Sequence, residues 1–213
     1  MPFHYRNMAA VILAATLLML AGCSSPAEKA QTSLSDIEEL QTSVMESFTQ
    51  LADLENRLQT EFEAALTEHE SLSTLSDGSA EVHANIEERR ELLETLSESN
   101  EEILSRHEEM LQIDNDEMPA EAFNGVLGSL DSVTESLDAF TESYGAQLDS
   151  EKTYFESLGQ DEADYETFQD GIERVNDEME GTWEIRRELD QAFVELEEAR
   201  NMLNAQLEEE ADE

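Results

Sequence analysis

Apolar residues recur at intervals of three and four along most of the chain, which is the spacing of a helix face that packs against other helices. Short groups of turn-forming residues interrupt this pattern. It predicts helices over about 26–75, 79–113, 119–158 and 162–208. The chain holds 8 Gly and 3 Pro among its 213 residues, so few positions would break these helices.

The predicted boundaries carry residues that favour helix starts and turns. Ser25-Pro26-Ala27-Glu28 has the pattern of a capping box, in which Ser and Glu satisfy each other's backbone N–H groups. Ser76-Asp77-Gly78-Ser79 is typical of a turn, Pro119 opens the third helix, and Asp161 is the predicted N-cap of the fourth. The connections between helices are therefore expected to be short.

Helices of similar length with short connections make sequential helices antiparallel neighbours. The sequence therefore predicts an all-α fold, an elongated up-down-up-down four-helix bundle with coiled-coil-like packing, formed as one domain over 23–213. The alternative is a three-helix arrangement in which one helix is broken at Gly125, Gly128, Gly171 or Gly181. In the fourth helix the residues expected to face the core are Tyr165, Phe168, Ile172, Val175, Met179, Leu189, Phe193, Leu196, Leu203 and Leu207.

Several polar residues fall on the predicted apolar faces: Arg89, Asn100, His107, Thr182, Arg186 and Arg200. One interpretation is a buried polar layer with Arg paired to Glu, which would fix the register of the helices. The second interpretation, which is the expected one, is drift between periods of 3.5 and 3.6 residues. Drift would leave these residues at the edge and give the core places to Trp183, Ile185 or Ala199.

The first 22 residues have the organisation of a signal peptide. The apolar run over 8–20 would form about 20 Å of helix, short of the roughly 30 Å of a bilayer core, and is typical of a secretory signal. It ends at Leu20-Ala21-Gly22-Cys23, which resembles the lipobox of bacterial lipoproteins. The resemblance implies cleavage before Cys23, a diacylglyceryl group and palmitate-type chains on this residue, and a position on the outer face of the cytoplasmic membrane. The alternative is an ordinary signal peptide beside an incidental cysteine.

Acidic residues outnumber basic ones by 53 to 11, which gives a formal net charge of −42. This balance argues against nucleic acid, whose phosphates are met by Lys and Arg, and against electrostatic adhesion to anionic lipid. Such acidity is typical of secreted proteins from saline or alkaline habitats, because salt screens the self-repulsion of the chain. We therefore expect halophilic or alkaliphilic adaptation, with a melting temperature that rises along a NaCl series; an unchanged midpoint in circular dichroism would contradict it.

Candidate chemistry is sparse. The histidines of the predicted helices are His69, His83 and His107, and none has the spacing of a zinc or di-iron motif. Asp114-Asn115-Asp116 begins like a calcium loop, but Pro119 and Gly125 stand where that loop requires Gly and Glu. This segment is therefore interpreted as a solvated turn, and we predict no enzyme activity, no cofactor and no metal site.

Lipid attachment at Cys23 would fix one end of the bundle at the membrane. The turns at 76–79 and 159–162 would then lie at the distal end, with the 114–119 loop and the C-terminus near the membrane. The aromatic residues that flank the second distal turn are Tyr154, Phe155, Tyr165 and Phe168. They form either a binding tip, which stacks on wall sugars or docks a partner, or bulky plugs for the end of the core.

Three parts of the sequence together resemble the YkyA-like cell-wall-binding lipoproteins of Gram-positive bacteria. They are LAGCSSP, the Leu/Phe/Glu heptads of the first helix, and EKTYFESLGQDEADYETFQDGIERVNDEME at 151–180. Tyr154, Leu158, Ile172 and Asn176 match the pattern of that family. The resemblance covers nearly the whole mature chain and implies a long helical bundle tethered outside the cytoplasmic membrane. Family members tend to be richer in Lys, so the resemblance does not imply charge-driven binding to anionic wall polymers.

These observations together predict a non-catalytic, lipid-anchored cell-envelope protein. It would act as a helical spacer or as a binding module for cell-wall polymer or an envelope protein partner. The alternative is an accessory or solute-capture lipoprotein of an envelope transporter. A solid bundle core leaves little room for the ligand pocket that this alternative requires.

Overall fold

The computed structural model describes residues 25–68, 72–114, 116 and 118–211. Nearly all of these residues are helical, and none of them lies in a strand. The elements are α1 (Pro26–Glu68), α2 (Ser73–Ser76), α3 (Glu81–Leu111), α4 (Ala120–Leu158) and α5 (Tyr165–Ala211). The prediction of an all-α fold is confirmed.

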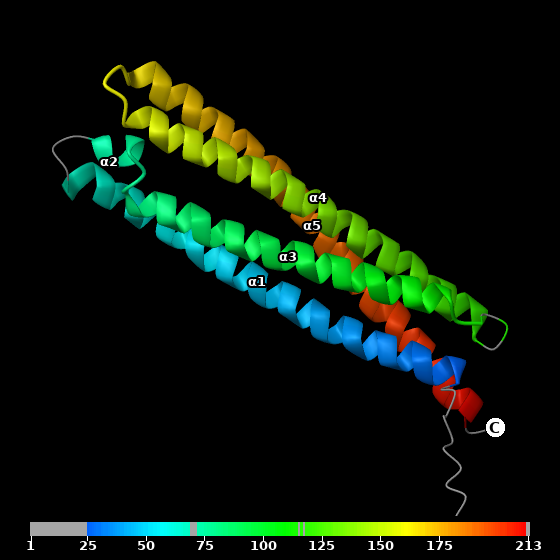
Figure 1. Ribbon diagram of the computed structural model, residues 1–213. Coiled ribbons are helices and arrows are strands. Elements are labelled where there is room, and N and C mark those ends of the chain that lie inside the picture. The colour runs from blue at the N-terminus through cyan, green and yellow to red at the C-terminus, as the bar shows by residue number, and fades with distance from the viewer. Residues whose placement is uncertain (1–24, 69–71, 115, 117, 212–213) are drawn as a thin grey trace, which may run out of the picture.

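The four long helices of the described chain run alternately up and down as an elongated bundle (Figure 1). Packing is closest between α4 and α5, followed by α1 with α3 and α3 with α4, whereas α1 and α5 barely approach each other. The alternative with a broken helix is not observed, since α4 continues through Gly125 and Gly128 and α5 continues through Gly171 and Gly181. The side between α1 and α5 is therefore the most loosely packed side of the bundle.

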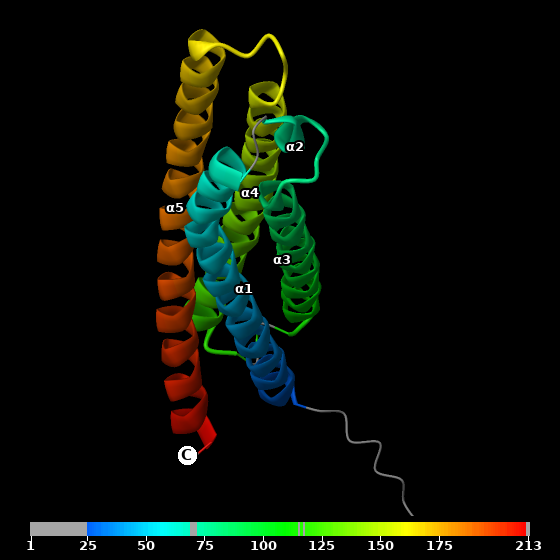
Figure 2. The same cartoon turned by 90° about the vertical axis from the view of Figure 1, so that its left-hand side faces the viewer.

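The two ends of the bundle carry different segments (Figures 1 and 2). The start of α1, the α3–α4 connection and the last turns of α5 lie together at one end, which we call the terminal end. The end of α1, α2 and the α4–α5 connection lie at the opposite end, which we call the turn end. This is the arrangement that the up-down-up-down prediction requires.

Helix starts follow local capping chemistry. The backbone N–H of Glu28 donates to Ser25 Oγ at 3.1 Å, and the backbone N–H of Ser25 donates to the Glu28 carboxylate at 2.9 Å, so the predicted capping box is confirmed. The prediction of Asp161 as the cap of α5 is wrong. The chain makes a further turn after α4, and Asp164 Oδ1 instead accepts the backbone N–H of Thr167 at 2.9 Å.

The first predicted helix, over 26–75, is also longer than the helix observed. α1 ends at Glu68, and α2 forms a separate short helix that packs against α4. This arrangement buries Leu75 completely in the core. The predicted turn that follows α2 is confirmed, and Gly78 adopts a φ of 79°, which favours glycine because it has no Cβ.

The core is shared differently at the two ends. Toward the terminal end all four long helices contribute fully buried residues, such as Ile37, Ile103, Val126 and Leu203. Toward the turn end most of the buried residues come from α2, α3 and α4, while α1 adds Leu54 and Ala65 and the first half of α5 remains largely exposed. The chain thus builds a four-helix core at one end and leaves one helix half outside it at the other.

Candidate functional site

A buried ion pair joins α3 and α4 in the half of the bundle toward the turn end. Arg89 is 0% exposed, and both Nη atoms of its guanidinium donate to the carboxylate of Glu151. Gln147 Nε2 donates to the same carboxylate at 2.8 Å. The Tyr144 hydroxyl accepts a hydrogen bond from Arg89 at 3.3 Å and donates one to Glu55 of α1 at 2.8 Å. The network therefore links three helices.

The electrostatics of this network favour a structural role. Burial opposes the charge of Arg89, but the hydrogen bonds and negative charge of Glu151 outweigh it and hold the pKa of the guanidinium above its ordinary value. Burial also raises the pKa of the Tyr144 phenol. The charges neutralise each other away from solvent, and the pair joins α3 to α4 inside the bundle. The expected drift interpretation is wrong for Arg89.

The other polar residues of the predicted seams divide between the two interpretations. His107 and Thr182 are buried, with exposed fractions of 5% and 4%. Asn100, Arg186 and Arg200 are half-buried at the edge of the core, where drift would leave them. Each takes a partner there: Asn100 donates to a backbone carbonyl of α4 at 3.2 Å, the Arg186 guanidinium lies 4.7 Å from the centre of a Phe ring of α1, and Arg200 pairs with an acid of α1 at 3.6 Å.

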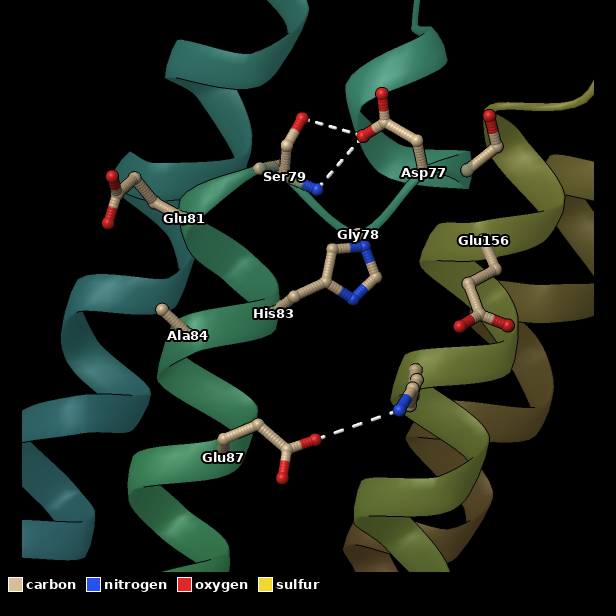
Figure 3. A pocket seen from close by; sticks show the side chains of 11 residues that line it. Asp77, Gly78, Ser79, Glu81, His83, Ala84, Glu87 and Glu156 are labelled. Carbon is tan, nitrogen blue, oxygen red and sulfur yellow. Dashed lines mark hydrogen bonds and ion pairs between the residues drawn. The ribbon is translucent and has the colours of Figure 1, made fainter.

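A polar hollow of about 510 Å³ opens to solvent at the turn end, between α4 and the turn after α2 (Figure 3). Several of its polar groups pair within the protein. His83 Nε2 lies 2.7 Å from a backbone carbonyl oxygen of α2, Lys152 Nζ lies 3.6 Å from Glu87, and the Ser79 hydroxyl donates to Asp77 at 2.6 Å. Among the described residues, no three His, Cys, Asp or Glu side chains are placed to share a metal ion. His69 lies outside the described residues. The carboxylates of Glu81 and Glu156 also line the hollow, so its surface is mainly acidic and open to solvent, without a metal cluster.

The predicted aromatic tip is only partly available for binding. Tyr154 and Phe155 are each 5% exposed, because they plug the core at the turn end, and the Phe155 ring packs on Phe62 with the ring centres 5.3 Å apart. For these two residues the burial agrees with the plug interpretation. Tyr165 is 78% exposed and Phe168 is 39% exposed, so both face solvent at the start of α5. Their role in binding stays a prediction.

Sequence reasoning missed that the exposed aromatics continue as a line of apolar residues along the first half of α5. The line, which we call the α5 stripe, consists of Tyr165, Phe168, Ile172, Met179 and Trp183. Ile172, Met179 and Trp183 are 38%, 40% and 51% exposed, although the sequence pattern assigned Ile172 and Met179 to the core and, with drift, offered Trp183 a core place. Periodicity marks an apolar face but carries no signal for whether a neighbouring helix covers it.

The predicted signal peptide over 1–22 and the lipobox Leu20-Ala21-Gly22-Cys23 lie outside the described residues. Lipid attachment at Cys23 therefore stays a prediction. No described helix is both long and apolar enough to cross a bilayer.

Comparison with known proteins places this bundle among related folds. A crystal structure of a conserved protein of unknown function from Staphylococcus aureus superimposes with a TM-score of 0.64 and 12% sequence identity, over 84% of this chain and 96% of that one. At this identity the similarity concerns the fold. A search of curated protein sequences gives no significant match. Residues 25–206 match the YkyA family, described as "Putative cell-wall binding lipoprotein", and the chain therefore belongs to that family.

Proposed function

We propose that the protein is a non-catalytic, lipid-anchored spacer of the cell envelope that carries a binding surface away from the membrane into the cell-wall zone. The observation that carries this proposal is the separation of the predicted anchor from the α5 stripe. α1 begins at Pro26, three residues after Cys23 in the sequence, and its start lies at the terminal end. The stripe begins at Tyr165, at the turn end.

The length of the bundle suits a spacer. α4 has 39 residues, which at 1.5 Å per residue corresponds to about 58 Å between the two ends. A diacylglyceryl group on Cys23 would hold the terminal end at the membrane, because two acyl chains are sufficient for stable anchoring. The turn end would then project outward, in agreement with the family description of a lipoprotein that acts at the cell wall.

The described surface supports a binding role over a catalytic or solute-capture role. A solute-capture protein needs an enclosed pocket that buries most of its ligand. The polar hollow at the turn end is instead open to solvent, and its lysine, Lys152, pairs with Glu87. The bundle interior is filled by side chains, and its most deeply buried charges, those of Arg89 and Glu151, neutralise one another. These features favour the spacer over the transporter alternative.

The proposal can be tested by comparing two forms of the protein in a Gram-positive host. The first is the natural chain, and the second is a chain from Ser24 to Glu213 secreted behind an ordinary signal peptide, which lacks the lipid anchor. We expect the natural chain to stay on protoplasts after the wall is digested. We expect the unlipidated chain to remain associated with intact envelopes through its binding surface and not to accumulate in the medium.

A full-length Cys23→Ala chain, labelled metabolically with a palmitate analogue, is the control for lipidation and should carry no label. Complete release of the unlipidated chain into the medium would remove the envelope-binding part of the proposal. A natural chain that leaves the protoplast together with wall fragments would remove the lipid-anchor part.

A further inference from the structure

The α5 stripe has the spacing of a coiled-coil seam. Tyr165, Ile172 and Met179 follow one another at seven-residue intervals, and Trp183 lies four residues further on. At about 100° per residue these side chains lie along one side of the helix. The stripe runs for about 27 Å from Tyr165 to Trp183 at 1.5 Å per residue. A surface of this length and spacing fits another helix better than it fits a globular ligand.

The stripe is uncovered because α5 uses a different row of residues to contact α4. Gly171 lies directly against the ring of Tyr154, where any larger residue would collide with it. Further along the same row, Thr182 Oγ1 lies 3.0 Å from Ser143 Oγ, and the carboxylate of Glu178 accepts a hydrogen bond from a serine of α4 at 2.8 Å. This row of small and polar residues lies roughly a quarter turn from the stripe. Docking on α4 therefore leaves the stripe on an open side of α5.

A row of acidic residues runs beside the stripe. Tyr165, Ile172, Met179 and Trp183 are each followed directly by a glutamate. These glutamates are Glu166, Glu173, Glu180 and Glu184, and all four are exposed. Since consecutive residues are separated by about 100° around a helix, the glutamates line the solvent side of the stripe. Across 165–184 the basic residue is Arg174, and the guanidinium of Arg186 lies 5.7 Å from the centre of the Trp183 ring at the end of the stripe. The rim is therefore negative along most of its length.

The acidic rim selects among the three kinds of occupant that an apolar helix face attracts. A second copy of this chain would bring the same acidic rim and a net charge of −42 against it, which opposes association. An anionic wall polymer would be repelled in the same way. A helix with apolar residues at intervals of three and four and with Lys or Arg beside them would bury the stripe and pair with the glutamates, as flanking charges do in coiled coils.

From this complementarity we infer that the α5 stripe is the docking site for a basic amphipathic helix of another cell-envelope protein. The inference rests on the proposed function, which places this surface outside the membrane, and it names the partner that the surface takes. The bound helix lies along the first half of α5, its apolar face covers Ile172, Met179 and Trp183, and its basic side chains face the glutamate row. The bound helix thus covers the part of α5 that no other helix of this chain covers.

The test is carried out in solution, so that its failure can be distinguished from loss of anchoring or of envelope association. Every described helix begins after Ser25, so the soluble chain Ser24–Glu213 keeps the whole described fold. The probe is a fluorescent peptide of about three heptads with Leu at the seam positions and Lys beside them. A peptide with the same Leu positions and Glu in place of Lys is the matched probe. Binding is measured by fluorescence anisotropy at low and high salt.

Two pairs of variants separate the stripe from general attraction. Met179→Ser with Trp183→Ser removes two of the five stripe residues, and Val194→Ser with Met202→Ser removes two residues of α5 that are comparably exposed, at 50% and 55%. Glu173→Gln, Glu180→Gln and Glu184→Gln together neutralise the rim. The same change at the exposed Glu91, Glu98 and Glu108 of α3 gives a control of equal net charge.

We expect the Lys-flanked peptide to bind with a Kd that rises at least about tenfold in the Met179/Trp183 variant and changes less than about twofold in the Val194/Met202 variant. The rim variant should weaken binding more than its α3 control, and the Glu-flanked peptide should not bind. Failure of the Lys-flanked peptide to bind, or equal effects in the matched variants, would overturn the inference. The chain could instead fail to bind the peptide but self-associate, or be retained on isolated walls, through the stripe. Loss of that behaviour in the Met179/Trp183 variant would identify a second copy or a wall polymer as the occupant and would also overturn the inference.

Discussion

The two halves of α5 have the same apolar periodicity but differ in how far their apolar side chains are buried. In the second half, Leu189, Leu196 and Leu203 are fully buried, because they belong to the core that all four long helices share toward the terminal end. In the first half, Ile172 and Met179 are more than a third exposed, because α5 contacts α4 but lies away from α1. One helix therefore serves as a core element at the terminal end and as a surface element at the turn end.

This difference shows that an amphipathic pattern specifies a face without specifying what covers it. Toward the turn end, where α5 contributes little to the core, residues of the other helices fill its place. The Arg89–Glu151 pair spans α3 and α4, Tyr144 extends the network to α1, and α2 closes the turn end by burying Leu75. The part of the core that α5 does not share is thus completed by long polar side chains and an additional short helix.

The largest effect is expected from breaking the polar layer. Arg89→Ala would leave the buried Glu151 carboxylate without its charge partner, and we expect a loss of about 3–5 kcal/mol in the free energy of unfolding. Urea denaturation followed by circular dichroism measures this loss. The double substitution Arg89→Met with Glu151→Leu should restore most of it, because both buried charges are then removed. A single-variant loss below about 1 kcal/mol would show that water reaches this layer and that it is not a sealed part of the core.

A pair of truncations within α5 tests the comparison directly. Leu196→Ala removes a fully buried side chain and should cost about 2–5 kcal/mol of unfolding free energy. Met179→Ala removes a side chain that is 40% exposed and should change stability by less than about 0.5 kcal/mol in the isolated protein. The same denaturation experiment measures both. Similar losses for the two variants would mean that the first half of α5 is covered in solution.

Much of this fold follows from residue spacing. Intervals of three and four place Leu34, Ile103 and Leu203 correctly in the core, and the capping box at Ser25 marks the start of α1. The number of long helices and their antiparallel order follow from the lengths of the apolar segments and from the short turns between them. The end of α1 was less predictable, because the contacts that make α2 a separate helix are with α4, which lies far away in the sequence.

The candidate surface was less predictable than the fold for the same reason. Tyr154 and Tyr165 flank one turn and have similar local sequence surroundings, but the first is buried and the second is exposed. What separates them is the close approach of α5 to α4 at Gly171, which is a property of two helices and not of one. The glutamate after each of four stripe residues can be read from the sequence. In so acidic a chain, however, this pattern points to a binding surface only when the exposed face of α5 is known.

The close approach at Gly171 provides the next prediction. A Cβ at this position would collide with the ring of Tyr154, so Gly171→Ala should destabilise the protein by about 1–3 kcal/mol and move the first half of α5 outward. Gly181→Ala is the matched control, because a Cβ there meets no atom within 4 Å, and it should stabilise the helix by about 0.5–1 kcal/mol. Thermal melts give both values. Equal stabilisation by the two variants would contradict the packing of α5 on α4.

The smallest effect is expected where α5 begins, at its cap. Hydrogen bonds from the backbone and side chain of Thr167 lower the pKa of the exposed Asp164 carboxyl. A lowered pKa in the folded state means that the unfolded chain binds the proton more tightly. The stabilisation by Asp164 is therefore present above the pKa of the unfolded chain, about 3.9, and is lost as the pH falls through the lower folded value.

Asp164→Ala should accordingly lower the melting temperature by a small amount at pH 7, and the difference from the natural chain should shrink as the pH is lowered toward 3. Asp161→Ala is the matched control, since Asp161 precedes the cap and should leave the melting temperature unchanged at both pH values. A larger effect at Asp161 than at Asp164 would mean that α5 begins earlier in solution. Tyr165, the first residue of the stripe, would then lie one turn inside the helix and be held in place by it, rather than at its first position.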